Sequence, residues 1–426
     1  MSKLSCIACQ KNYEITENRV VCECGGLLDV QQDFAELKKL KLKELFESRL
    51  GSRELPDASG VWRYRELLFP TKKIISRFEG NTRLYPARKL SQELGVELFF
   101  KHEGENPTGS FKDRGMCSAI TAGVSLGCHS FVCASTGNTS ASLASYCAEA
   151  GLNGIVIIPA GKIAFGKLSQ ALAFGAKVLQ IEGDFDAAMQ LVNELGKQFD
   201  PQNPAESIYV LNSVNPFRIE GQKTIVFEIL QQLNWEAPDW IVLPAGNLGN
   251  SSAFGKAIVE AFELGLIDRK PRLVSVQAAG ANPFFNYFES GWENFSAVEN
   301  PETIATAIKI GNPQSYLRAK RSIEETNGIV LEASENEILD AKATIDASGI
   351  GCEPASACSL AGIRQLAQSG VIKKGEKVVG VLTGNLLKDP DATINYHTGK
   401  LAGIEAKMAN QSQQIEASVD AVLSAI

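Results

Sequence analysis

The stretch DWIVLPAGNLGNSSAFGKAIVEAFELG, residues 239–265, joins a short apolar run, a glycine-containing turn and a longer amphipathic segment. The run from Trp240 to Ala245 is short and rich in β-branched and aromatic side chains, which predicts a strand buried on both faces. The pattern from Ser251 to Gly265 predicts a helix. A strand followed directly by a helix is the repeating unit of parallel sheets, so this stretch predicts an α/β fold.

The same alternation of short apolar runs and helical patterns extends to both sides of this unit. Further strands are predicted at ELFFKHE (97–103), SFVCAS (130–135), GIVIIPA (154–160), KVLQIEG (177–183), SIYVLNS (207–213), RLVSVQA (272–278) and KVVGVLTG (377–384). These strands are too many for one compact unit. We therefore expect two parallel-sheet domains, with helices on both faces and a cleft between them.

The domain organisation that we expect has four parts. Residues 1–80 form an N-terminal extension with a Cys-rich ribbon, 81–125 and 216–400 form a large α/β domain, and 126–215 form a small α/β domain. Residues 401–426 form a C-terminal helix docked on the body, because Ile404, Met408, Ile415, Val419 and Val422 recur at rough helical spacing.

Composition and charge argue against two classes of partner. The chain has 426 residues and a net charge of -7, and its Lys and Arg residues are scattered, which argues against a nucleic-acid binder. The sequence contains no apolar run of the ~20 residues that a membrane-spanning helix needs. The first residues, MSKLSCIACQ, lack the apolar region of a secretory signal, so we expect a cytoplasmic protein.

Four of the ten cysteines, Cys6, Cys9, Cys22 and Cys24, follow the pattern C-x2-C-x12-C-x-C. Two pairs about a dozen residues apart resemble the knuckles of a zinc ribbon and predict a structural zinc site. The alternative is a ribbon that keeps its shape without metal. The other cysteines stand among apolar or small residues and are expected to be buried: Cys117, Cys128, Cys133, Cys147, Cys352 and Cys358.

Two predicted strand–helix junctions carry residues suited to anions. In PAGNLGNSS (244–252), Gly246 and Gly249 let backbone N–H groups turn toward a phosphate at the start of the next helix. The alternative is an ordinary tight turn. In ASTGNTSAS (134–142), Ser135, Thr136, Asn138, Thr139 and Ser140 crowd one turn and suit a carboxylate. The alternative is an elaborate helix cap, although one hydroxyl is enough for that purpose.

A third junction, ENPTGSFKDRG (105–115), places Lys112 in the first turn of a helix, with Ser110 and Asp113 spaced as a capping box. A cation there opposes the helix dipole, so a merely stabilising role is unfavourable, although a solvated surface lysine is the simpler interpretation. A partly desolvated amine loses proton affinity and can bind an aldehyde covalently. Together with a phosphate-binding turn, Lys112 indicates pyridoxal phosphate.

Five motifs resemble those of the threonine synthases in order and approximate spacing. They are NPTGSFKDRG, STGNTSAS, NSVNPFRIEGQKT, LPAGNLGN and LTGNLLKDPD, and the resemblance extends from about Phe78 to Asp391. The threonine synthases are pyridoxal-phosphate enzymes of fold type II, the group of the tryptophan-synthase β-subunit. The resemblance implies that the larger domain binds the cofactor, that the enzyme is a homodimer, and that the Cys segment is the ribbon preceding many members.

The resemblance also implies a role for individual residues. Lys112 would bind the cofactor and move protons, and Asn138 would hydrogen-bond the phenolic oxygen of its ring. The cofactor phosphate would be held by Gly246, Asn247, Leu248, Gly249 and Asn250, and Thr383 would face the ring nitrogen. The substrate carboxylate would meet Ser135, Thr136, Asn138 and Thr139, and the leaving phosphate would meet Asn212, Ser213, Arg218, Asn247 and Thr139.

The activity implied by the resemblance is γ-elimination of phosphate from O-phospho-L-homoserine and addition of water at Cβ, giving L-threonine and phosphate. The chain departs from the family at Asn385 and Leu386, where most members have His and Gly. Any role that the family's histidine has at this position is therefore absent here. The alternatives are another fold-type-II enzyme acting on a phosphorylated amino acid, such as a cysteate-synthase-like β-replacement, or a serine/threonine dehydratase. Arg218 favours a phosphorylated substrate.

Overall fold

The predicted alternation of strands and helices forms two parallel sheets in the computed structural model, which describes residues 2–161 and 165–426. The larger sheet has the spatial order β12-β11-β10-β13-β5-β4, and only β4 runs antiparallel to its neighbour. Its strands are β4 (Leu84–Pro86), β5 (Glu97–His102), β10 (Trp240–Pro244), β11 (Arg272–Ala278), β12 (Ile329–Ala333) and β13 (Lys377–Leu382). Every residue of β10 is buried, as a central strand covered on both faces requires.

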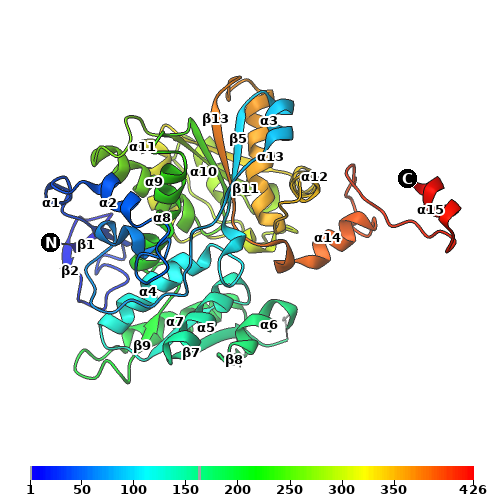
Figure 1. Ribbon diagram of the computed structural model, residues 1–426. Helices are drawn as coiled ribbons and strands as arrows, with labels where there is room; N and C mark the ends of the chain where they lie inside the picture. The colour runs from blue at the N-terminus through cyan, green and yellow to red at the C-terminus, as the bar shows by residue number, and fades with distance from the viewer. Residues whose placement is uncertain (1, 162–164) are drawn as a thin grey trace.

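The smaller sheet is wholly parallel and has the order β8-β7-β6-β9. Its strands are β6 (Ser130–Ala134), β7 (Asn153–Pro159), β8 (Lys177–Ile181) and β9 (Ile208–Val210). In Figure 1 this sheet and its helices lie below the larger sheet. All seven further strands that the sequence predicts are present, and the fold is the expected α/β fold with helices on both faces of parallel sheets.

Helices pack on both sheets and connect them. Helix α13 packs on β10 and β13, α9 and α11 pack on β11, and α5 and α7 pack on the smaller sheet, while α8 packs against both α4 and α9. The helices of the body are α3 (Arg88–Leu94), α4 (Lys112–Ser125), α5 (Asn138–Ala150), α6 (Phe165–Ala173), α7 (Phe185–Lys197), α8 (Pro216–Gln232), α9 (Gly249–Glu263), α10 (Pro283–Glu289), α11 (Tyr316–Glu325), α12 (Glu335–Ala347), α13 (Pro354–Gln368) and α14 (Pro390–His397). Short 3-10 turns are η2 (Glu103–Glu105), η3 (Ala279–Ala281), η4 (Thr306–Ile308) and η5 (Leu386–Lys388).

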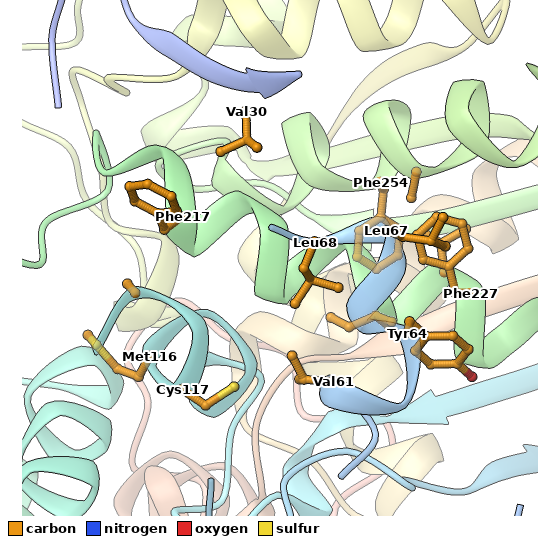
Figure 2. Close-up of a cluster of buried hydrophobic side chains, with 14 of the residues drawn as sticks. Val30, Val61, Tyr64, Leu67, Leu68, Met116, Cys117, Phe217, Phe227 and Phe254 are labelled. Atoms are coloured by element: carbon orange, nitrogen blue, oxygen red, sulfur yellow. The ribbon is translucent and has the colours of Figure 1, made fainter. Parts of the chain in front are cut away.

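The N-terminal segment is built into the body. It contains a three-stranded antiparallel sheet, two short helices and a 3-10 turn: β1 (Lys3–Cys6), β2 (Asn12–Glu14), β3 (Leu28–Gln31), α1 (Phe34–Leu37), α2 (Leu42–Ser48) and η1 (Trp62–Leu67). Figure 2 shows Val61, Leu67 and Leu68 packed among side chains of α4, α8 and α9, including Met116 and Phe227. Because these side chains are fully buried, the segment completes the core around α4 and α8.

Ion pairs and a hydrogen bond also hold strand β3 against α9 and α11. The Asp29 carboxylate lies 3.1 Å from Nε of Arg318 and also pairs with Arg321, both on α11. Lys256 of α9 donates to the Val30 carbonyl at 2.5 Å. Asp29 and Arg318 are both buried, so this contact fixes the ribbon against α9 and α11.

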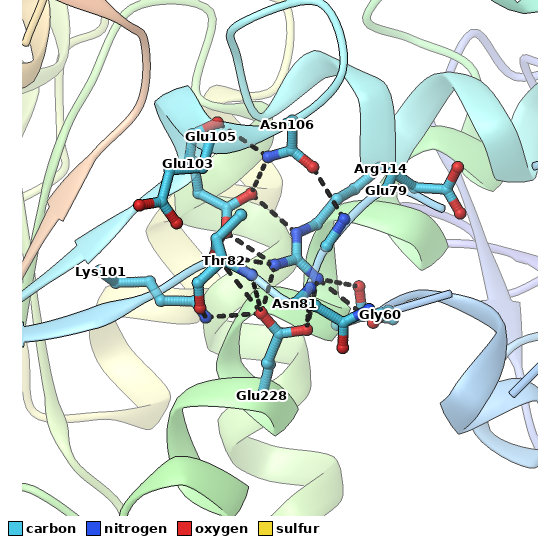
Figure 3. Close-up of polar contacts among 12 residues, drawn as sticks. Gly60, Glu79, Asn81, Thr82, Lys101, Glu103, Glu105, Asn106, Arg114 and Glu228 are labelled. Atoms are coloured by element: carbon cyan, nitrogen blue, oxygen red, sulfur yellow. Dashed lines mark hydrogen bonds and ion pairs between the residues drawn. The ribbon is translucent and has the colours of Figure 1, made fainter. Parts of the chain in front are cut away.

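A buried network of four charges fixes the start of α4 (Figure 3). Arg114 donates to Glu103 at 2.7 Å and to Glu228 of α8 at 2.9 Å, and Lys101 of β5 donates to Glu228 at 2.6 Å. Although burial alone would raise the pKa of Glu228, the charges of Arg114 and Lys101 hold it well below the ordinary range. Two cations meet two anions, so the network is balanced in charge and satisfied in hydrogen bonds.

The C-terminal segment differs from the expectation. The structure has α15 only over Val419–Ala425, and residues 401–418 form turns and irregular chain. Val419, Val422 and Leu423 are exposed, and α15 lies away from the body in Figure 1. The prediction of one docked helix over this segment is therefore wrong. Leu401 and Ile404 pack beside Tyr396 as irregular chain, and the apolar side chains of α15 have no packed surface to stabilise a longer helix. Within the described chain, no helix is both long and apolar enough to span a bilayer.

Candidate active site

The carboxyl ends of strands from both sheets border one cleft of about 1290 Å³. All the residues for which the sequence predicts a cofactor or substrate role line it. They are Lys112, Ser135, Thr136, Asn138, Thr139, Asn212, Ser213, Arg218, Gly246, Asn247, Leu248, Gly249, Asn250 and Thr383. The structure therefore brings together residues from five separate motifs, at the edge of the sheets where ligands bind in α/β folds.

Lys112 is the first residue of α4 and is half-buried in the cleft. Its Nζ lies 3.7 Å from the centroid of the Phe111 ring. Burial, with the positive charge of Arg218, lowers the pKa of the Lys112 amine to about 7, while the charge of Glu353 partly opposes this. A large fraction of the amine is therefore uncharged at neutral pH, which is the form that attacks an aldehyde.

The loop before Lys112 is held by the loop after β13. Phe111 N donates to the Thr383 carbonyl at 3.0 Å, and Asn385 N donates to the Gly109 carbonyl at 2.9 Å. Ser110 and Gly384 also form a β-bridge. These backbone bonds fix Lys112 next to Thr383, although the two residues are far apart in the sequence.

The predicted capping box before α4 is wrong. The residue preceding the helix is Phe111, and no side chain caps it. The Asp113 carboxylate instead accepts bonds from the Thr108 N–H and hydroxyl, both at 2.7 Å, and from Ser142 at 2.6 Å. Asp113 thus folds the loop back on itself, and the burial of its carboxyl raises its pKa to about 6.

The turn from Gly246 to Asn250 has the geometry of an anion site. Leu248 adopts a left-handed conformation, with φ of 63°, and precedes α9 without a side-chain cap. The first N–H groups of α9 are therefore left for a ligand. Both polar atoms of the Asn250 amide are buried without a partner, and a Cβ on Gly246 would lie 3.0 Å from Ile308 Cα. The residues present here fit a phosphate group.

The N-terminus of α5 is open in the same way. Its first flanking residue is Gly137, and no side chain caps the helix. The Ser135 hydroxyl accepts a bond from the Gly137 N–H at 3.2 Å, and the Ser140 hydroxyl donates to the Gly137 carbonyl at 2.8 Å. The cluster of hydroxyls is therefore not a set of helix caps, and the helix N-terminus faces the cleft.

Arg218 of α8 is a buried cation in the cleft. It donates to the Leu211 carbonyl at 3.1 Å, and its Nε is buried without a partner. Among the side chains that the structure describes, no carboxylate pairs with its guanidinium. Burial lowers the pKa of Arg218 to about 10, so it keeps its charge at neutral pH. Nearby, Asn247 Nδ2 donates to the Ser213 hydroxyl at 3.0 Å. An uncompensated buried guanidinium fits an anionic ligand.

The first turn of α13 contributes residues that the sequence analysis did not identify. The Ser356 hydroxyl is hydrogen-bonded to that of Thr383 at 3.1 Å and accepts from Gly384 N at 3.0 Å. The Glu353 carboxylate accepts from Asn138 Nδ2 at 3.1 Å. The signal available was Pro354, which favours the first turn of a helix and so marks the start of α13.

A second amine, Lys388, lines the cleft and was also not identified. It donates to the Gln170 side chain, and burial lowers the pKa of its amine. Asn385, at the position where the chain departs from the family pattern, caps the turn η5 by accepting from Leu387 N at 3.0 Å. Its Nδ2 also donates to the Gly104 carbonyl at 3.4 Å, so Asn385 has a structural place at the rim of the cleft.

The four ribbon cysteines converge away from the cleft. The Sγ atoms of Cys6, Cys9, Cys22 and Cys24 all lie within 4.8 Å of one another, with separations of 3.6 Å between Cys6 and Cys24 and 3.4 Å between Cys9 and Cys24. Four sulfurs at ~2.3 Å from a tetrahedral zinc stand roughly 3.8 Å apart. The cluster therefore fits a closed, structural zinc site.

Comparisons with known proteins give a consistent result. The model of the family described as "Pyridoxal-phosphate dependent enzyme" matches residues 75–384. The chain is 47% identical to the threonine synthase of Methanocaldococcus jannaschii over 91% of this chain and 93% of that one. It is 43% identical to the threonine synthase of Methanosarcina acetivorans over 100% of this chain and 99% of that one.

Solved structures with a similar fold include the threonine synthase of Escherichia coli. That structure matches with a TM-score of 0.67 and 17% identity, over 99% of each chain. The processed form of threonine deaminase isoform 2 from Solanum lycopersicum matches with a TM-score of 0.60 and 21% identity, over 74% of this chain and 82% of that one. At these identities the similarity establishes the fold alone.

Proposed function

Because the chain belongs to the pyridoxal-phosphate dependent enzymes, and within them to the threonine synthases, we propose that the cleft around Lys112 is its active site. The chain is a pyridoxal-phosphate-dependent lyase with threonine synthase activity. It converts O-phospho-L-homoserine and water into L-threonine and phosphate, a reaction of amino-acid biosynthesis.

One observation supports this site above all others. An amine whose pKa is lowered to about 7 lines the same cleft as a buried guanidinium that has no carboxylate partner among the residues the structure describes. The amine suits covalent capture of an aldehyde, and the guanidinium suits a phosphate that arrives with the substrate and leaves during the reaction. A dehydratase acting on free serine or threonine has no use for the second feature.

The cofactor would be held at three points. Lys112 would bind its aldehyde carbon, the turn from Gly246 to Asn250 would hold its phosphate through the N–H groups of α9, and Thr383 would face the ring nitrogen. Asn138 would donate to the phenolic oxygen. When bound, pyridoxal phosphate acts as an electron sink that makes the protons on the substrate carbons acidic.

The chain's own residues would bind the substrate and move its protons. The open N-terminus of α5, with Ser135, Thr136 and Thr139, would take the α-carboxylate. Arg218 would hold the phosphate, together with Asn212, Ser213, Thr139 and Asn247. The neutral amine of Lys112 would accept the proton from Cα, a proton would leave Cβ, and phosphate would depart from Cγ toward Arg218. Cγ would then take up a proton, the hydroxyl of water would add at Cβ, and a proton would return to Cα.

Replacement of Lys112 by Ala tests the assignment. Borohydride reduction of the wild-type enzyme should fix the cofactor on the peptide that contains Lys112, as mass spectrometry would show, and Lys112→Ala should give no such adduct and no threonine. Lys388→Ala is the matched control, because it removes another amine that lines the cleft. Its adduct should persist, and an adduct lost in both variants would refute Lys112 as the attachment point.

Further proposals concern the parts of the chain outside the cleft. We propose that Cys6, Cys9, Cys22 and Cys24 bind one structural zinc ion, supported by the convergence of their sulfurs. We also propose the domain division 1–80, 81–125 with 216–400, 126–215 and 401–426, and a cytoplasmic homodimer without nucleic-acid partners. Metal analysis and analytical ultracentrifugation of the purified protein test the zinc and the dimer.

A further inference from the structure

A hydrogen bond across the cleft connects the two sheets at the site. Asn138 begins α5, which packs on the smaller sheet, and Glu353 immediately precedes α13, which packs on the larger one. Asn138 Nδ2 lies 3.1 Å from Glu353 Oε2 and 3.4 Å from Oε1, so one amide hydrogen is shared between both carboxylate oxygens. The second hydrogen of the amide is left for another acceptor.

The Glu353 carboxylate has no evident structural purpose of its own. Glu353 is the residue that flanks α13, but its side chain makes no capping bond. It is only 4% exposed, and in the described part of the chain no cation lies within ion-pairing distance of it. A Cβ on Gly384 would clash with Oε1, so the carboxylate rests against the backbone next to Thr383. Because burying a carboxylate is costly, this placement calls for another explanation.

Three charged groups, from two parts of the chain, face Glu353. They are Lys112 at the start of α4, and Lys388 and Asp389 after β13. Burial raises the pKa of Glu353, while the bond from Asn138 and the charge of Lys112 oppose that rise. Asn138 is thus the direct partner of Glu353, and the amines act on it from a greater distance.

The same helical turn also reaches the other end of the site. Ser356, three residues after Glu353, is hydrogen-bonded to the Thr383 hydroxyl at 3.1 Å. The first turn of α13 therefore contacts both Asn138 and Thr383, the two residues proposed to contact the phenolic oxygen and the nitrogen of the cofactor ring. This turn is placed to orient the side chains that hold the ring.

We propose that Glu353 is a positioning residue: its carboxylate holds the Asn138 amide so that the second N–H group points at the phenolic oxygen of the cofactor. The proposal rests on the proposed function, because it concerns the cofactor site. An ionised carboxylate can only accept hydrogen bonds, so Nδ2 must face it. Without Glu353 the amide can turn over and present its oxygen to the phenolic oxygen, and two acceptors repel.

The first test is a double-mutant cycle on cofactor affinity. Equilibrium dialysis of the full-length holoenzyme against graded pyridoxal phosphate gives the dissociation constant for the wild type, Glu353→Ala, Asn138→Ala and the double variant. Glu353→Ala should raise the constant about tenfold in the wild-type background, but less than about twofold when Asn138 is already absent. Independent effects that simply multiply would overturn the proposal.

The second readout is the visible absorption of the bound cofactor, which a merely structural role would not move. Glu353→Ala and Asn138→Ala should displace the absorption maximum in the same direction, and the double variant should displace it no further. Ser359→Ala is the matched control, because Ser359 is buried one turn along α13 and donates only to the Ser356 carbonyl at 2.8 Å. Its spectrum should match that of the wild type.

Two further outcomes keep the tests decisive. If Glu353→Ala lowers the thermal midpoint, Glu353→Gln preserves the side-chain volume and should give a smaller but equally non-additive effect. A wild-type enzyme without a reducible adduct on Lys112 would refute the proposed function and this inference together. An adduct on Lys112 combined with wild-type affinity and spectrum in both Glu353 variants would overturn the inference alone.

Discussion

Two buried arginines, Arg114 in the first turn of α4 and Arg218 on α8, show how differently this protein treats charge. Arg114 lies between Glu103 and Glu228, and Lys101 completes a group of two cations and two anions (Figure 3). Arg218 faces the cleft, and among the described side chains it has no carboxylate partner. Both arginine residues are at least 96% buried.

The two arginines differ in role: Arg114 stabilises the fold, and Arg218 is available to a ligand. Although burial would lower the pKa of Arg114, its two carboxylate partners raise it well above the ordinary value, whereas burial lowers the pKa of Arg218 to about 10. A buried charge without a partner destabilises the protein, so such a charge is typical of a binding site, where a ligand supplies the missing partner. The same reasoning applies to Lys112, whose amine loses proton affinity instead of gaining a counter-ion.

The largest effect is expected where the charges are balanced. Arg114→Met should lower the free energy of unfolding by about 3–5 kcal/mol, because Glu103 and Glu228 would stay buried without their shared cation. Urea denaturation of both proteins measures the change. The same substitution at Arg218 is the matched control and should leave stability unchanged or higher. Equal destabilisation of the two variants would show that Arg114 and Arg218 contribute to stability in the same way.

Removal of the unpaired guanidinium should affect catalysis instead. Arg218→Met should lower kcat/KM for O-phosphohomoserine by roughly 10²–10³-fold, because the departing phosphate loses a bidentate donor. Cofactor content, measured by absorbance after release, should stay at the wild-type level. A variant that loses its cofactor in proportion to its activity would contradict the assignment of Arg218 to the substrate phosphate.

Much of this site could be predicted, because its residues lie where strands end. Lys112, Asn138, Gly246 and Thr383 each follow an apolar run, and the carboxyl ends of parallel strands meet in space. The lowered pKa of Lys112 was expected from desolvation at a helix N-terminus. The structure adds Arg218 as a second cause, which sequence spacing does not reveal.

Residues that depend on long-range packing could not be predicted. Glu353 follows no predicted strand, and it reaches Asn138 only because α13 packs on β10 and β13. The prediction for the C-terminal segment was wrong for the opposite reason. Its apolar residues have helical spacing, but Val419 and Leu423 are exposed, so periodicity alone was not enough to make a docked helix.

A smaller effect is expected on the pH dependence of the reaction of Lys112 with an aldehyde. Dialysed protein treated with pyridoxal phosphate and then borohydride should be labelled at Lys112 at a rate that rises with pH through a midpoint near 7, because only the uncharged amine attacks the aldehyde. Arg218→Met should move this midpoint upward by about one pH unit, since a positive charge that lowers the pKa is gone. Peptide mass spectrometry measures the labelling at each pH. An unchanged midpoint would show that the two cations do not interact.

The smallest effect on catalysis is expected at the ribbon, where the missing partner would be a cation. The four sulfurs all lie within 4.8 Å of one another, as the ligands of a tetrahedral zinc would, so we expect one zinc ion per chain. Removing it with a chelator should open residues 7–27 to protease, because these turns depend on the sulfurs. Strand β3 should stay docked through Asp29 and Arg318, which lie 3.1 Å apart, so threonine formation should change by less than about twofold. Cys9→Ser should behave like the chelated enzyme, and a loss of activity parallel to the loss of zinc would place the ribbon among the parts that the active site requires.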